Sequence, residues 1–185
     1  MRLRKPQHSK LKGLAAGAIG GLVASWIMGY VHAALGGAQQ QSGGESASEG
    51  ARRGDQQQQQ QQSGGEDATV KTAVAIAEGV FHHPIPEEKK KTAGSIVHYA
   101  YGTALGALYG MTAEEIPAAR WGEGALFGTA VWLGSDEIAV PALKLAKGPS
   151  EYPLKVHAGA WASHIVYGVT TELVRRGLRA GVLSR

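Results

Sequence analysis

Three ionisable side chains lie inside apolar stretches of this 185-residue chain: His98, Asp136 and His164. Imidazole titrates near neutral pH, and a histidine–carboxylate set suits either proton transfer or a divalent transition metal. An ionisable group within a membrane span costs about 2.5–3.5 kcal/mol, so such groups are usually paired or functional. The three residues predict either a hydrogen-bonded pair that fixes helix packing or a site that binds a divalent cation or relays protons.

Three further polar residues are expected close to this set. Ser25 and Tyr101 are predicted at a similar depth in their helices, and Glu137 follows Asp136 directly. Neighbouring residues on a helix point about 100° apart, so the two acids are expected to face different partners. Pro141 removes the backbone hydrogen bond that would reach the Glu137 carbonyl, which predicts a break in this helix.

Four apolar segments must position these residues. Each is near the roughly 20 residues that cross a hydrocarbon core about 30 Å thick. The mean hydropathy of the whole chain is only −0.16, because residues 37–68 are rich in Gln, Gly and Ser. The pattern predicts an all-α, multi-pass transmembrane helix bundle of about four spans, covering residues 11–35, 92–111, 122–143 and 156–174.

Glycines recur at intervals of four in these segments, and the polar residues share their stripes. Residues four apart lie on one helix face, and small residues let helices approach closely in lipid. The same faces offer a route to a homo-oligomer. The glycines predicted to make helix contacts are Gly13, Gly17, Gly21, Gly94, Gly102, Gly106, Gly124, Gly128 and Gly168.

The chain divides into four parts by composition. Residues 1–36 hold a basic N-terminus and the first span, and residues 37–68 are a predicted disordered Gln-rich loop. Residues 69–91 predict a short interfacial helix and loop, and residues 92–185 hold three spans and a basic C-terminus. A cleaved signal peptide at the N-terminus is the alternative, and it would leave three spans.

Charge and motifs narrow the function. Basic residues flank the apolar segments without interleaved aromatic residues, which favours a lipid bilayer over nucleic acid as the partner. Both termini are basic and are predicted to be cytoplasmic, although Lys89, Lys90 and Lys91 oppose that orientation. The chain has no cysteine, so it has no thiolate metal site, and it has no nucleotide-binding or hydrolase motif.

Three stretches resemble a YagU-type family of small bacterial inner-membrane proteins without an assigned activity. They are VHYAYGTALGALYG (97–110), WLGSDEIAVPAL (132–143) and EYPLKVHAGAWASHIVYGVTTELVRR (151–176). The resemblance implies a location in the bacterial inner membrane and brings no substrate. The leading interpretation is therefore a membrane protein of unassigned, non-enzymatic role without a cofactor. The alternatives are a small transporter, channel or proton- or metal-handling protein, and an intramembrane metalloenzyme with a divalent metal.

Overall fold

The computed structural model describes residues 10–41 and 64–181, and over these residues the chain forms only helices and loops. The predicted all-α fold is therefore confirmed for this part of the chain. The elements are α1 (Lys10–Gln41), α3 (Gly64–Gly79), α4 (Glu87–Glu115), a 3₁₀ segment η1 (Pro117–Gly124), α5 (Ala125–Trp132), a π-helix η2 (Leu133–Ala139), α6 (Val140–Ala142), a 3₁₀ turn η3 (Pro149–Glu151) and α7 (Leu154–Ala180).

The boundaries of the predicted parts differ from the observed helices. Helix α1 continues to Gln41 and α3 begins at Gly64, so the expected loop of residues 37–68 is shorter, and residues 42–63 lie outside the described part. Helix α4 begins at Glu87 rather than beyond Lys91. Pro86 precedes its first turn, and Glu87 and Glu88 face the positive end of the helix dipole.

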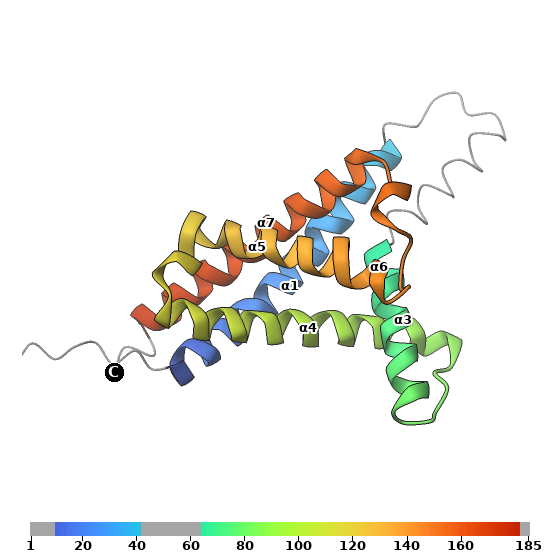
Figure 1. Cartoon of the computed structure of the whole chain (residues 1–185), viewed down its shortest axis with the longest axis horizontal. Coiled ribbons are helices and arrows are strands. Elements are labelled where there is room, and N and C mark those ends of the chain that lie inside the picture. The colour runs from blue at the N-terminus through green and yellow to red at the C-terminus, as the bar shows by residue number, and fades with distance from the viewer. Residues whose placement is uncertain (1–9, 42–63, 182–185) are drawn as a thin grey trace, which may run out of the picture.

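Helix α1 lies at the centre of the bundle and packs against both α4 and α7 (Figure 1). It runs antiparallel to α4, because Gly13 meets Gly110 while Gly21 meets Gly102. The continuous run α5–η2–α6 lies antiparallel along α7, and α3 packs against the start of α4. The start of α1 and the ends of α4 and α7 therefore gather at one end of the molecule.

The contact between α1 and α4 is made by backbone against backbone. A methyl group added to Gly17 would fall on the Gly106 carbonyl oxygen, and one added to Gly110 would fall on the Gly13 carbonyl oxygen. Only glycine permits this approach, because any Cβ would force the helices apart. These α1 and α4 glycines therefore make contacts within the chain, and the expected homo-oligomer through glycine-rich faces stays a prediction.

The other glycines of the predicted stripes also lie at helix contacts. Gly124 and Gly128 of the third segment pack against the α7 backbone at Gly168 and His164. Gly94 instead meets Val70 of α3. The spacing of four residues thus serves two separate helix pairs, α1 with α4 and α5 with α7, and one contact with α3.

The third segment is interrupted near Pro141, but by a change of helix type rather than by a kink. Residues 133–139 form a π-helix, in which the Val140 N–H reaches the Ser135 carbonyl five residues back. Proline cannot donate to the Glu137 carbonyl, and the wider turn rearranges the hydrogen bonds ahead of it. Both acids of the segment, Asp136 and Glu137, lie in this π-helix.

Helix α1 is the one described helix that is long and apolar enough to cross a membrane, over Lys10–Val31. Its place near the N-terminus also fits the signal-sequence alternative. Helices α4 and α7 have the required length, but they do not meet the same hydropathy criterion. Hydropathy therefore supports one span, and the expected count of four stays a prediction.

Candidate functional site

Two acid–imidazole pairs join the π-helix to α7. The Nδ1 atom of His164 lies 3.7 Å from Asp136 Oδ2, and the Nδ1 atom of His157 lies 2.6 Å from Glu137 Oε1. The first separation fits an ion pair and is too long for a hydrogen bond, whereas the second is a short hydrogen bond. The two acids point to different partners, as the 100° spacing on a helix predicts.

The two imidazoles differ in what else they contact. His164 is buried, and its Nδ1–H donates to the Ala160 carbonyl one turn earlier at 2.9 Å. His157 lies in the first turn of α7, where its Nε2–H donates to the Pro149 carbonyl at 3.0 Å. The Asp136–His164 pair thus joins the π-helix to α7, with the Asp136 side chain 37% exposed, whereas Glu137–His157 also ties the bundle to the loop before α7.

The remaining expected residues form separate contacts between helices. Tyr101 of α4 shares a hydrogen bond of 2.8 Å with Ser135, the neighbour of Asp136. His98 Nε2 lies 3.4 Å from the Ser25 carbonyl of α1. Together these pairs place polar side chains on all four long helical segments. We call their members the interhelical polar set: Ser25, His98, Tyr101, Ser135, Asp136 and His164.

The interhelical polar set consists of separate pairs and is not a single cluster. Within residues 10–41 and 64–181, no three His, Asp or Glu side chains come together in a way that could hold a metal ion. Asp136 and His164 are neighbours, while His98 turns to the backbone of α1. The described structure therefore brings Asp136 and His164 together and leaves His98 apart from them.

A second ionic assembly lies at the end of the bundle where the helices α4 and α7 terminate. Glu172 is 1% exposed and Arg175 is 3% exposed. Arg175 donates to both oxygens of Glu172, at 2.7 and 2.9 Å, and to Glu114 of α4 at 3.0 Å. We call this assembly the terminal ionic cluster, and its members are Tyr109, Glu114, Glu172, Arg175 and Arg179.

Charges balance inside the terminal ionic cluster. Two carboxylates face two guanidinium groups, and the Tyr109 hydroxyl donates to Glu172 at 2.9 Å. Burial lowers the pKa of Arg175, but the hydrogen bond and charge of Glu172 outweigh it, so the net pKa lies above the ordinary arginine value. Arg175 is therefore held in its charged form, and the cluster locks α4 to α7.

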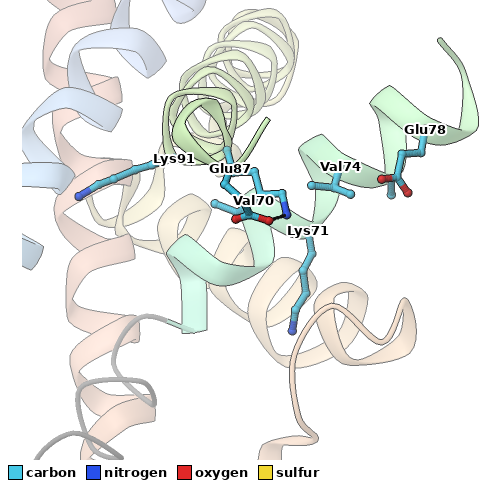
Figure 2. A pocket seen from close by; sticks show the side chains of 8 residues that line it. Val70, Lys71, Val74, Glu78, Glu87 and Lys91 are labelled. Carbon is cyan, nitrogen blue, oxygen red and sulfur yellow. Dashed lines mark hydrogen bonds and ion pairs between the residues drawn. The ribbon is translucent and has the colours of Figure 1, made fainter. Parts of the chain in front are cut away.

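A groove of about 710 Å³ runs along the contact between α3 and the start of α4 (Figure 2). Its apolar floor includes Val70 and Val74, and charged side chains line its rim. Three of these charged side chains have partners: Lys90 pairs with Glu87, and Lys71 donates to the Leu145 carbonyl at 3.0 Å. The contacts around the groove join α3 to α4 and to the loop after α6, and they do not define a ligand.

Sequence reasoning missed His157 and the terminal ionic cluster. His157 and His164 are seven residues apart, which puts them two turns apart on the same face of α7, and this spacing was the available signal. Glu172 and Arg175 are three apart, and this spacing alone accounts for a pair within one helix without any role between helices. Nothing in the sequence places Tyr109 and Glu114 beside them, because that contact depends on how α4 packs.

The fold and these contacts define a class: an all-helical bundle with glycine-mediated helix contacts and ion pairs in its interior. The chain belongs to the family described as "Protein of unknown function (DUF1440)", whose model matches residues 74–173. The matched segment runs from α3 into α7 and contains both acid–imidazole pairs. No curated protein and no solved structure matches the chain. The family is uncharacterised, so the likeness to YagU-type proteins stays a prediction.

Proposed function

We propose that the chain is a multi-pass protein of the bacterial inner membrane, with lipid around α1, α4, the α5–η2–α6 run and α7. The role proposed is that of a non-enzymatic membrane component. The observation that supports it best is the distribution of side chains, which is inverted relative to a water-soluble bundle. Large apolar side chains face outward, while polar and charged side chains are enclosed.

Exposed large apolar side chains occur on every long segment. Leu22, Leu108, Leu126 and Leu173, one from each of the four segments, are between 47% and 56% exposed. The fully buried hydrophobic residues of the described chain are mainly alanines, beside Met28, Tyr109 and Tyr167. The buried polar set is Ser25, Ser135, Ser163, His164, Thr171, Glu172 and Arg175. In water such an arrangement exposes apolar surface and encloses charge, whereas in lipid both features are favourable.

The charge distribution supports cytoplasmic termini. Lys10 pairs with Glu115, and Arg176 pairs with Glu123, at the same end as the terminal ionic cluster. Lysine and arginine beside spans are enriched on the cytoplasmic side. At the opposite end α3 exposes Ile76, and the loop after it exposes Val80 and Phe81, which suits a helix that lies in the headgroup region.

The membrane proposal predicts which engineered cysteines react from outside the cell. The natural sequence has no cysteine, so single substitutions report without background. An impermeant maleimide is expected to label Ser150→Cys on intact spheroplasts and to label Ala118→Cys only after lysis. Both residues are exposed, at opposite ends of the bundle. Equal labelling of both before lysis, or recovery of the folded chain in buffer without detergent, would contradict the proposal.

Proton handling is the second candidate function, and the two acid–imidazole pairs favour it. Asp136 and Glu137 are adjacent in one π-helix, and their partners His164 and His157 lie two turns apart on α7. Histidine is the side chain used most often as a proton shuttle, so a histidine beside a carboxylate suits proton transfer. A divalent cation at Asp136 and His164 stays a prediction, which direct metal analysis of the detergent-purified protein tests.

Proton handling predicts that Asp136→Asn lowers proton flux in proteoliposomes by at least about tenfold, because the amide cannot bind and release a proton. A pH-sensitive dye inside vesicles under a potassium diffusion potential measures the flux. Glu88→Gln is the matched control, since Glu88 is exposed at the start of α4. If the control and Asp136→Asn carry the same flux as the natural chain, the pairs serve packing alone.

A further inference from the structure

His157 is placed so that each of its ring nitrogens faces an acceptor. Nδ1 lies 2.6 Å from the Glu137 carboxylate, and Nε2 lies 3.0 Å from the Pro149 carbonyl. A carbonyl oxygen can only accept, so Nε2 must carry a hydrogen. A second hydrogen must lie between Nδ1 and the carboxylate, because two lone pairs at that separation repel. The arrangement therefore holds two protons, which an imidazolium beside a carboxylate supplies.

The ring joins three separate segments. Glu137 comes from the π-helix, Pro149 begins the η3 turn, and His157 belongs to α7. Between α6 and α7 runs the segment of residues 143–153. Its first three residues donate backbone hydrogen bonds to the helical run before them, from Leu143 to Ala139, from Lys144 to Pro141 and from Leu145 to Val140. Its Leu145 carbonyl accepts from Lys71 of α3, and Tyr152 sets its ring edge-on to the His157 ring at 6.3 Å between centroids.

The charged and titratable groups around the ring come from each neighbouring element. Glu137 and Asp136 lie on the π-helix, and Lys71 reaches the loop from α3. Tyr152 accepts from the Lys147 N–H at 3.3 Å, and Glu151 accepts from the Gly148 N–H at 3.1 Å. The Glu137 carboxylate is the one that bonds the ring directly, so it governs the charge of His157.

A neutral imidazole has one N–H and can satisfy only one of the two acceptors. We propose that His157 is a proton-operated latch, which holds residues 146–153 against the π-helix while the ring is protonated and releases them when the proton leaves. Because Glu137 adjoins Asp136, the latch couples a proton at the end of the bundle to the helix that carries the Asp136–His164 pair. The latch stands on contacts within the chain and does not depend on the membrane proposal.

Spin labels on the full chain test the latch, with Ala118→Cys at one end of the bundle and Ser150→Cys in the η3 turn. The chain lacks natural cysteine, so both labels are unambiguous. Electron–electron distance measurements in detergent are expected to give a narrow distribution of label-to-label distances at about pH 5 and a broad one at about pH 9. These two values lie on either side of the pH range over which histidine changes charge. A width that does not change with pH would overturn the proposal.

Two variants and one control tie the change to His157. With His157→Phe the distribution is expected to be broad at every pH, because phenylalanine donates no hydrogen bond. With Glu137→Gln the broadening is expected to begin at lower pH, by about one unit or more, because the carboxylate no longer favours the imidazolium. His83→Gln should behave as the natural chain, since His83 is exposed in the loop after α3.

Helix content, measured by circular dichroism, distinguishes a folded variant that lacks the His157 contacts from a variant that is unfolded. If His157→Phe does not fold, the Glu137→Gln shift decides the matter in a chain that keeps its charged ring. An unshifted transition in Glu137→Gln, or a pH-dependent width that survives in folded His157→Phe, would refute the latch. Either result leaves the maleimide labelling of Ser150→Cys unaffected, so the membrane proposal is judged separately.

Discussion

Replacing Glu172 with alanine is expected to destabilise the bundle by about 3–5 kcal/mol, the usual cost of leaving one partner of a buried ion pair alone. Arg175 would lose the carboxylate that receives two of its hydrogen bonds, and Tyr109 would lose its acceptor. Both residues are buried, so water cannot replace the lost contacts. Thermal unfolding followed by circular dichroism in detergent measures the effect.

Arg176→Ala is the matched control for this cluster. Arg176 pairs with Glu123, but both side chains are more than half exposed, and exposed pairs contribute about 0–1 kcal/mol. The joint replacement Glu172→Met with Arg175→Met should cost less than Glu172→Ala, because no unpaired charge remains inside. The structural role assigned to the cluster would be contradicted if Glu172→Ala and Arg176→Ala unfolded at the same temperature.

The same substitution is expected to have opposite consequences at two glycines of α1. Gly17→Ala should destabilise by about 1–3 kcal/mol or more, because the new methyl group meets the backbone of Gly106 and Gly110, which cannot rotate away. Gly29→Ala should be neutral or stabilise by up to about 1 kcal/mol, since nothing lies within 4 Å and alanine favours a helix. Thermal unfolding of the two variants side by side makes the comparison.

A larger residue at the α1–α4 contact extends the comparison. Gly106→Leu should prevent the two helices from meeting and leave no folded, monodisperse protein after detergent extraction. Gly177→Leu provides its control, because space around Gly177 is open. Similar behaviour of Gly17→Ala and Gly29→Ala would mean that α1 and α4 do not approach backbone to backbone.

The positions of the helices could be read from the sequence to a large degree. Apolar runs and glycine intervals located all four long segments. Three of these lie within α1, α4 and α7, and the third segment along the chain, residues 122–143, begins in η1 and covers the α5–η2–α6 run. Pro141 indicated where the third segment would be irregular. The end of α1 and the start of α3 lie inside the segment expected as a loop. At α1 the reason is that Ala and Gln favour a helix and carry no stop signal, whereas nothing in the sequence indicates the helical start of α3 at Gly64.

The sequence by itself determined which residues share a helix face, and so which glycines and polar side chains would meet another helix. Only the tertiary structure decided their partners. In the folded chain Asp136 pairs with His164, Glu137 pairs with His157, and His98 lies beside the Ser25 carbonyl. Glu172 is enclosed with Arg175 and Glu114. The reason is physical: helical periodicity fixes a direction around one axis, whereas a contact also requires the rotation and depth of the second helix. Those two quantities follow from backbone packing at the glycines and from the π-turn before Pro141.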